Sequence, residues 1–399
     1  MVVRRKMKKK YLYTKTIRNW LILGLILLIG QVIIGGITRL TGSGLSITSW
    51  DIITGVIPPL NKAQWIELFD IYKETPQYQK INSDFTLKDF KFIYFWEYLH
   101  RLWVRALGLI FLIPFVIFLI RKQIDWFLVK RLLLVVALAG LTASAGWIMV
   151  LSGLVDRPWV NAYKLTLHFM LAIVTIGAMV KAIADVFLME NKPLKGHTRF
   201  VLILLVFTGL QLVFAGLMAG MRAGLAYPTW PSMNGAFIPK ILLDSSNWTW
   251  ENMTNYDSFS FAPALVQFVH RGLAYIILGL TFYFYHKKRN HVHTSAIKWL
   301  TVSYVLVVFQ VFLGIMTLLK IKTGIPLFYG TLHQLFGLLY VISLLFLYYS
   351  RSCFLADLSS RCSRKWASRL FLRSPITCCL AKRVYYLLDT PFISGLARL

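Results

Sequence analysis

Four histidines stand inside long apolar stretches of this sequence, where ionisable side chains are rare and usually functional. They are His100, His168, His270 and His333. The charged residue that closes each stretch follows 17 to 21 residues later, at Arg121, Asp185, Lys287 and Arg351. A helical rise of about 1.5 Å per residue places all four histidines about 25–32 Å from that end. They therefore share one depth, near the opposite boundary of a hydrocarbon core about 30 Å thick.

Three uses of such histidines compete: interhelical hydrogen bonding, a proton path and metal ligation. A proton path needs groups at successive depths, whereas these four are level. Axial ligation of a haem needs two imidazoles at matching depth on facing helices. We predict two bis-histidine haem sites, pairing His100 with His168 and His270 with His333, although spacing alone leaves pairing across the halves open. The other histidines lie in basic connections and are interpreted as solvated: His197, His286, His291 and His293.

Two further residue types flank the histidines. Arg101 and Arg271 each directly follow one, and guanidinium groups suit carboxylates, so both are candidates for binding haem propionates; the alternative is a snorkelling interfacial arginine. Glu97 stands three residues before His100, whereas the equivalent position in the second half is Gln267. The i, i+3 spacing lets Glu97 face the same cavity as the histidine. Glu97 is therefore the candidate catalytic group, able to accept a proton or stabilise positive charge, with an i, i+4 ion pair to Arg101 as the alternative.

The elements that carry these residues are eight apolar runs, each long enough at about 20 residues to cross a bilayer as a helix. The composition agrees, because 57% of the 399 residues are hydrophobic and 15% are charged, against about a quarter charged in a soluble domain. We predict an all-α integral membrane protein. The runs lie near 20–38, 98–120, 132–152, 164–184, 200–219, 263–285, 299–319 and 328–349.

The net charge of +28 is concentrated at the chain ends and in alternate connections. The positive-inside rule then places both termini in the cytoplasm or on the equivalent matrix side. Basic residues in this arrangement mark topology and contact anionic lipid, which speaks against nucleic acid as a partner. The basic clusters lie in 1–18, 121–131, 191–199, 286–298 and 351–399.

The two ends of the chain carry distinctive residues: a basic N-terminus followed by an apolar run, and a C-terminal tail that contains the cysteines. The basic start and the run "LILGLILLIG" (21–30) resemble a secretory signal, but the run is too long and lacks a cleavage site, so we expect a retained signal-anchor. This start favours a bacterial plasma membrane over the mitochondrial inner membrane. All four cysteines follow the last run without zinc-site spacing: Cys353, Cys362, Cys378 and Cys379.

An internal repeat organises the chain. A shift of 180 residues aligns 35–60 with 215–240, and "YLHR" (98–101) answers "FVHR" (268–271). Each unit contains an even number of spans, so we predict two tandem four-helix bundles related by a pseudo-two-fold axis along the membrane normal. The identities in the first alignment pair Gly36, Gly44, Leu45, Trp50, Gly55 and Pro59 with Gly216, Gly224, Leu225, Trp230, Gly235 and Pro239.

The predicted organisation has five parts, with two equivalent loops, 39–91 and 220–262, expected to form caps on the outer side. The parts are a basic cytoplasmic N-terminus 1–19, an N-terminal four-helix unit 20–187, a cytoplasmic linker 188–199, a C-terminal four-helix unit 200–350, and a basic tail 351–399 to which we assign no role.

Several motifs resemble the haem A synthase family, particularly its mitochondrial and proteobacterial-like branch, over residues 20–348. They are "GGITRLTGSGLSITSWDIITGVIPPL" (35–60), "FKFIYFWEYLHRLWVRALG" (90–108), "FVHR" (268–271) and "TLHQLFG" (331–337). The resemblance implies oxidation of the C8 methyl of haem O to a formyl group through a hydroxymethyl intermediate, giving haem A for cytochrome oxidase. One departure is the first outer loop, which lacks the cysteine pair of some members.

The same resemblance implies roles for individual residues and partners. His100 and His168 would flank the substrate haem O with Glu97 catalytic, while His270 and His333 would ligate a haem b cofactor. Haem O synthase and cytochrome oxidase assembly factors are the protein partners it implies. Oligomeric state, including a homo-oligomer, the electron donor and the oxygen source stay open.

Three other functions are weighed on the residues alone. A dihaem b-type electron-transfer cytochrome would keep both haems unchanged, and the contrast between Glu97 and Gln267 speaks against it. A transporter built from parallel repeats would need an alternating path, which level histidines do not provide. A prenyltransferase would need Asp-rich diphosphate motifs near a span, and the 16 acidic residues form none.

Overall fold

The computed structural model describes residues 13–49, 54–155, 157–187, 192–193, 198–289, 294–324 and 326–352. Contacts group residues 1–189 and 193–350 into one compact unit and residues 190–192 and 351–399 into a second. Most of the predicted N-terminal segment, most of the linker and the tail from 353 on, with its four cysteines, lie outside the described residues. His197, His291 and His293 lie outside them as well.

Eight of the described helices are long and apolar enough to cross a membrane, which confirms the predicted all-α membrane fold with eight spans. The bounds differ from the apolar runs chiefly in the second span, which begins at Leu87 rather than near residue 98. The spans are α1 (Lys15–Leu40), α4 (Leu87–Ile120), α5 (Trp126–Leu151), α6 (Ala162–Phe187), α7 (Thr198–Gly220), α11 (Phe261–Lys288), α12 (Thr294–Lys320) and α13 (Leu327–Tyr349).

Polar caps explain where two of these helices begin. Thr86 caps α4, and its hydroxyl and the Asp89 carboxylate form a reciprocal capping box. Asp125 caps α5 by accepting a hydrogen bond of 3.0 Å from the amide of Leu128. Because the capping box precedes the apolar run by about three turns, the first turns of α4 extend beyond that run.

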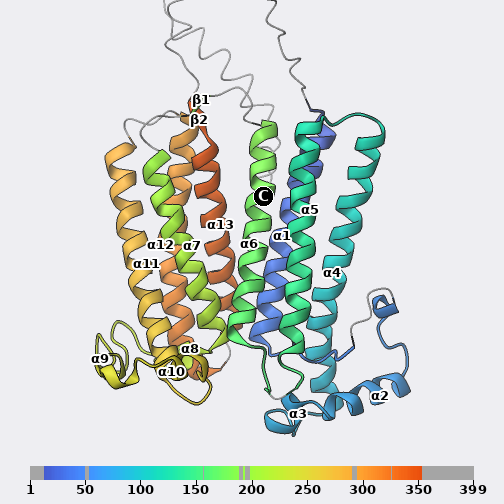
Figure 1. Ribbon diagram of the computed structural model, residues 1–399, viewed down its shortest axis with the longest axis vertical. Coiled ribbons are helices and arrows are strands. Elements are labelled where there is room, and N and C mark those ends of the chain that lie inside the picture. Colours follow the sequence, from blue (N-terminus) through green and yellow to red (C-terminus); the bar gives the residue numbers. More distant parts are fainter. Residues whose placement is uncertain are drawn as a thin grey trace, which may run out of the picture. The chain divides into compact units, whose positions relative to one another are not determined.

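Short elements fill the connections, and Figure 1 shows the helical ones gathered at one end of the long helices. Between α1 and α4 lie η1 (Thr54–Val56), α2 (Lys62–Lys73) and α3 (Pro76–Lys80). Between α7 and α11 lie α8 (Ala223–Ala226), α9 (Lys240–Leu243), η2 (Ser245–Asn247) and α10 (Trp250–Thr254). The remaining elements are η3 (Ile321–Thr323) and a two-stranded sheet of β1 (Lys192–Pro193) and β2 (Arg351–Ser352).

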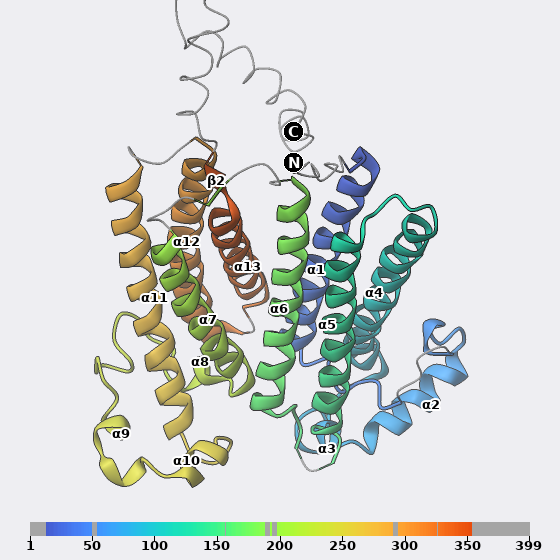
Figure 2. The same cartoon turned by 45° about the horizontal axis from the view of Figure 1, so that its top comes forward.

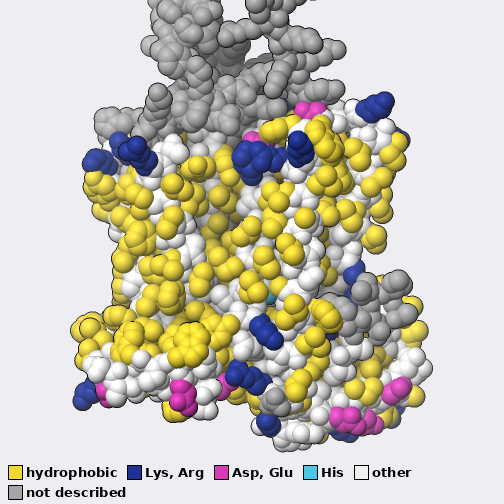
Figure 3. Space-filling model, in the orientation of Figure 1, with side chains coloured by type: hydrophobic (Ala, Val, Ile, Leu, Met, Phe, Trp, Pro, Cys, Tyr) yellow, Lys and Arg dark blue, Asp and Glu magenta, His cyan; other side chains and the backbone are white. Residues whose placement is uncertain are grey.

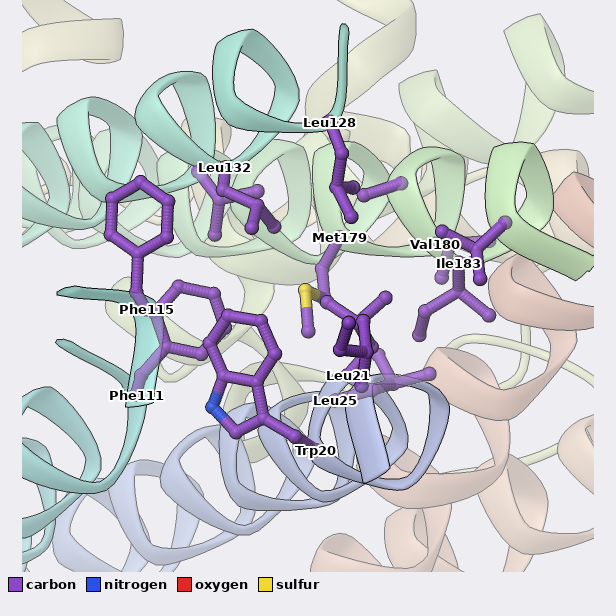
Figure 4. Packing of buried hydrophobic residues seen from close by; sticks show 14 of the residues in the cluster. Trp20, Leu21, Leu25, Phe111, Phe115, Leu128, Leu132, Met179, Val180 and Ile183 are labelled. Carbon is purple, nitrogen blue, oxygen red and sulfur yellow. The ribbon is translucent and has the colours of Figure 1, made fainter. Parts of the chain in front are cut away.

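The N-terminal bundle of α1, α4, α5 and α6 has an apolar core at the end away from the outer loops. Trp20 of α1 stacks on Phe111 of α4 with ring centroids 4.8 Å apart. Leu128, Leu132 and Met179 complete this cluster from α5 and α6, each 0% exposed (Figure 4). Close packing of this kind closes that end of the bundle.

The C-terminal bundle of α7, α11, α12 and α13 mixes apolar and hydroxyl groups at the corresponding depth. Thr281 and Tyr340 are hydrogen-bonded at 2.7 Å, and Ser303 and Ser343 at 2.8 Å. These side chains are buried, and the bonds join α11 and α12 to α13. Hydrogen bonding across helices satisfies polar groups that lipid cannot.

The two bundles meet along α1, α6, α7 and α13, which lie at the centre of Figures 1 and 2. Glycines allow this close approach. A Cβ on Gly220 of α7 would lie 2.6 Å from the Cα of Ala162 in α6. On α1, a Cβ on Gly36 would overlap the side chain of Gln334, which donates a 2.7 Å hydrogen bond to the carbonyl of Val32.

The surface in Figure 3 carries an apolar band over the long helices, with Lys and Arg side chains towards both ends. Lys130 of α5 and Lys287 of α11 lie over the rings of Trp126 and Tyr283. An apolar band bounded by cations and aromatic rings is typical of a protein embedded in a bilayer. The pseudo-two-fold relation and the five-part division of the chain stay predictions.

Candidate functional site

The four histidines lie on four different helices and meet in pairs within each bundle. His270 of α11 and His333 of α13 have ring centroids 6.4 Å apart with an interplanar angle of 71°. His100 of α4 and His168 of α6 are close enough to interact electrostatically. Metal–imidazole nitrogen bonds are about 2 Å long, so two rings on opposite faces of one iron have centroids about 6 Å apart. The His270–His333 spacing fits this arrangement.

Backbone carbonyls orient one imidazole in each pair. The Nδ1 atom of His168 lies 2.8 Å from the carbonyl oxygen of Thr142 in α5. The Nδ1 atom of His333 lies 3.0 Å from the carbonyl oxygen of Gln310 in α12. A carbonyl only accepts hydrogen bonds, so each Nδ1 carries the proton and Nε2 is the nitrogen left to bind a metal. His168 and His333 are therefore held in a fixed orientation, one in each bundle.

Glutamines accompany the other histidines and were missed in the sequence. The Nε2 atom of Gln31 lies 3.1 Å from Nδ1 of His100 and donates to the His100 carbonyl at 3.2 Å. The Nε2 atom of Gln211 donates to the His270 carbonyl at 3.0 Å. Both glutamines occupy equivalent positions in the 180-residue repeat, which is the signal that would have found them. In α12, Nε2 of Gln310 also approaches Nε2 of His333, at 3.4 Å.

Glycines form the surface against which three of the rings lie. A Cβ added to Gly35 would lie 2.9 Å from Cε1 of His100. One on Gly146 or Gly314 would lie 2.8 Å from Cε1 of His168 or His333. These distances are shorter than any ordinary carbon–carbon contact, so a larger residue would displace the imidazole.

The donor sets fit haem. Within the described residues, Nδ1 of His270 and the Oε1 atoms of Gln31, Gln211 and Gln310 are buried without a hydrogen-bond partner. Buried polar atoms of this kind call for a partner, and paired imidazoles at this spacing are the axial donors that a haem iron takes. His100 with His168 and His270 with His333 would hold the two groups. A bound haem would supply redox chemistry at its iron.

Glu97 is buried, at 3% exposed, and both its oxygens are engaged. Oε2 accepts hydrogen bonds from the amide and hydroxyl of Ser46 at 2.7 and 2.8 Å and from the amide of Ile47 at 3.0 Å. Oε1 pairs with Arg101 at 2.6 Å. The i, i+4 ion pair considered as an alternative is therefore present. Its carboxylate lies one turn from His100 and anchors the first outer loop.

The arginines after the histidines also contact the outer loops. Arg101 donates to the carbonyls of Ile47 at 2.8 Å and Ser49 at 2.7 Å. Arg271 donates to the carbonyls of Tyr227 at 3.0 Å and Thr229 at 2.7 Å. Both guanidinium groups therefore fix a loop over a histidine site, and their predicted contact with haem propionates stays a prediction.

The position equivalent to Glu97 completes the comparison of the two halves. Gln267 is fully buried and donates from Nε2 to the carbonyl of Tyr227 at 2.8 Å. The two halves share one scheme in which a residue before the histidine and an arginine after it hold the loop. Only the N-terminal version contributes a carboxylate beside the histidine.

One charged residue near the N-terminal pair was overlooked. Arg105 lies on α4 five residues beyond His100, within the apolar span, and it is half-buried. The repeat places Tyr275 at the equivalent position, where its hydroxyl accepts a 2.9 Å hydrogen bond from Nε1 of Trp230. A guanidinium group at membrane depth is a functional candidate, and the charge inside an apolar run was its signal.

Known proteins match this chain over most of its length. Residues 18–345 match the family described as cytochrome oxidase assembly protein (COX15-CtaA). A protein named haem A synthase from Flavobacterium psychrophilum is 38% identical over 329 residues, covering 80% of this chain and 93% of its own length. Proteins of the same name from Nitrosospira multiformis and Brucella anthropi are each 39% identical, over 340 and 327 residues. They cover 84% and 82% of this chain and 93% and 89% of their own lengths.

These matches confirm the resemblance carried by the motifs around the histidines. They extend across both bundles and include all four histidine positions within the matched range. An identity near 38% over four fifths of the chain is far beyond a similarity of apolar composition. The chain belongs to the haem A synthase family of cytochrome oxidase assembly proteins.

Proposed function

We propose that this protein is a haem A synthase, an oxidoreductase that converts the C8 methyl of haem O to a formyl group through a hydroxymethyl intermediate. The relatives named haem A synthase and the family match support the overall activity. The observation that carries the finer proposal is the contrast between Glu97 and Gln267 at equivalent places beside the two histidine pairs. One pair is equipped for chemistry, and the other is equipped to hold a cofactor.

The N-terminal pair, His100 and His168, binds the substrate haem O in this proposal. Glu97 is the catalytic residue, able to accept a proton from the reacting methyl group or to stabilise positive charge beside it. Four hydrogen-bond donors fix its two oxygens, so the carboxylate needs no reorganisation when charge develops nearby. Arg101 holds the loop that covers this site, and in this proposal it also contacts a propionate at the edge of the haem.

The C-terminal pair, His270 and His333, holds a resident haem b. Gln267 and Arg271 hold the second outer loop without adding a negative charge. A closed environment without a carboxylate beside the histidine suits a cofactor that is bound and kept unchanged. The product haem A serves cytochrome oxidase, so haem O synthase and oxidase assembly factors are the expected protein partners.

The membrane setting follows from the distribution of charge. The protein is an integral membrane protein, and we place both termini on the cytoplasmic or matrix side and the outer loops opposite them. The relatives reported above are bacterial, which favours the bacterial plasma membrane. The histidine sites then lie in the outer half of the bilayer, beneath these loops.

Analysis of extracted haems tests this function. The full chain, co-expressed with an enzyme that supplies haem O, is purified and its haems are separated and identified by mass. We expect haem B together with haem A or hydroxymethyl haem O. Two molecules of haem B per chain and no oxidised product would instead identify a dihaem electron-transfer cytochrome.

A further inference from the structure

The two bundles differ in how their helices close around the histidine pairs. In the C-terminal bundle, α11 packs against both α7 and α12, and α13 completes the ring. In the N-terminal bundle, α4 packs along α1 but makes no comparable contact with α5, although only the short connection 121–125 joins them. The helices can be followed in Figure 2. The N-terminal bundle is therefore open between α4 and α5.

One stripe of α5 shows where this opening lies. Val129 and Leu132 on the stripe are 3% and 0% exposed, and Phe115 of α4 lies beside Leu132 in Figure 4. Ala143 and Trp147 continue the same stripe at helical spacing, yet Ala143 is exposed and Trp147 is 44% exposed. The bundle is therefore sealed at the end holding the phenylalanines and open at the level of the histidines.

The equivalent stripe of α12 stays covered. Thr142 and Gln310 present equivalent carbonyls to the histidines, which fixes the register between α5 and α12. In that register Ala143 corresponds to Val311, which is half-buried, and Trp147 corresponds to Ile315, also half-buried. The opening is thus a property of the N-terminal bundle alone.

The face of α4 that borders the opening is also exposed at the level of the histidines. Val104 follows His100 by four residues and so lies on the same face of the helix, but it is 41% exposed. Val104, Ala143 and Trp147 offer an apolar border, level with the site and continuous with the lipid-facing surface. Such a border suits a hydrocarbon chain, because it needs no hydrogen-bond partners.

We propose that the isoprenoid side chain of haem O leaves the N-terminal site through this opening and lies between α4 and α5 at the edge of the bilayer. The inference rests on the proposed function and adds to it the feature that selects haem O. The loop held by Glu97 and Arg101 covers the outer end, and the phenylalanine cluster closes the other. A long apolar chain on a macrocycle held by His100 therefore leaves sideways. Haem B has no such chain and suits the closed C-terminal ring.

The test fills the opening and compares two haems. Ala143→Phe in the full chain, purified with its C-terminal haem, is titrated with haem O and separately with haem B, and uptake at the N-terminal site is followed by absorbance. We expect haem O binding to weaken roughly tenfold while haem B binding is unchanged. Ala137→Phe is the matched control, since Ala137 is exposed on a different face of α5, and it should bind both haems like wild type.

A second variant and the spectrum of the C-terminal haem distinguish a filled opening from a misfolded protein. Ala143→Leu should give a smaller loss for haem O, and an unchanged spectrum of the C-terminal haem reports intact folding. Wild-type affinity for haem O in Ala143→Phe, or an equal loss for both haems, would overturn this inference while leaving the proposed function standing. A wild-type protein that never takes up haem O at the N-terminal site would overturn both.

Discussion

Glu97 and Gln267 occupy equivalent positions one turn before a histidine, and both hold an outer loop onto a helix. Gln267 does so with one hydrogen bond to the carbonyl of Tyr227. Glu97 accepts three from Ser46 and Ile47 and pairs with Arg101. A loop anchor alone does not need a carboxylate, as Gln267 demonstrates. The carboxylate beside His100 is therefore the difference between the two sites that points to a catalytic role for Glu97.

Glu97→Gln separates charge from size at this position. We expect haem to stay bound in both bundles while haem A formation falls by about 100-fold or more, the range for loss of a positioned acid–base group. The measurement is the amount of haem A per chain in extracted haems. Glu67→Gln, in the exposed part of α2, is the control and should leave haem A formation unchanged. Wild-type haem A in Glu97→Gln would remove Glu97 from the catalytic role.

Single histidine variants assign the two haems to the two bundles. His100→Ala should lose the substrate haem and all product, yet retain haem B, because His270 and His333 are on other helices. His270→Ala should reduce the haem B content instead. Haem B and oxidised haems per chain are measured by chromatography with mass detection. Loss of the same haem in both variants would contradict pairing within each bundle.

At the scale of elements, the orientations of His168 and His333 depend on the helix hairpins that carry them. α5 supplies a carbonyl and a glycine to His168, and α12 supplies the same two features to His333. The carbonyl selects the tautomer, and the glycine lets the helix approach the ring. The hairpins α5–α6 and α12–α13 therefore act as matched holders for one histidine each.

Gly146→Ala tests the N-terminal holder. A Cβ there would lie 2.8 Å from the His168 ring, so the ring must turn away from the Thr142 carbonyl and lose its hydrogen bond. We expect occupancy of the substrate haem to fall about tenfold, in line with loss of a partner that orients a metal ligand, with haem B unaffected. Absorbance of the bis-histidine haem and haem content per chain are measured.

Two matched variants accompany this substitution. Gly314→Ala should lower haem B instead, because Gly314 contacts His333. Gly108→Ala on α4 should change neither haem, since an added Cβ there meets no atom within 4 Å. An effect of Gly108→Ala as large as that of Gly146→Ala would mean that helix stability, rather than ring position, sets haem content.

At the scale of the whole molecule, several glycines bring the two bundles together along the seam formed by α1, α6, α7 and α13, and Gly220 and Gly36 differ in what they face. Gly220 of α7 faces the backbone of Ala162, which cannot move alone. Gly36 of α1 faces the end of the Gln334 side chain, which can swing away but would give up its hydrogen bond to Val32. The contact of Gly220 with Ala162 is therefore rigid, whereas the contact of Gly36 with Gln334 can adjust.

Substitution at these two glycines should therefore destabilise to different extents. Gly220→Ala should lower the free energy of unfolding by about 1–3 kcal/mol through overpacking, and Gly36→Ala by about 1 kcal/mol through one lost hydrogen bond. The thermal midpoint in detergent is measured for each. Gly279→Ala is the control: the added Cβ meets no atom within 4 Å, so its thermal midpoint should not fall. A larger loss in Gly36→Ala than in Gly220→Ala would contradict this account of the seam.

Much of the fold was readable from the sequence because it depends on local chemistry. Eight apolar runs, the charge of their connections and the repeat of "YLHR" and "FVHR" led to the membrane class and the histidine positions. Depth along a helix follows from residue number alone, since the rise per residue is constant. That regularity is why four level histidines could be recognised without coordinates.

The tertiary structure decided what depends on contacts between distant segments. Glu97 and Arg101 could be placed beside His100 by spacing, but their partners in 46–49 come from a loop about 50 residues away. Gln31, Gln211 and Gln310 approach the histidines only once four helices pack. The opening between α4 and α5 has no local signature, because both helices are apolar and similar in sequence character to α11 and α12. Packing between helices, rather than the pattern along any one of them, distinguishes an open bundle from a closed one.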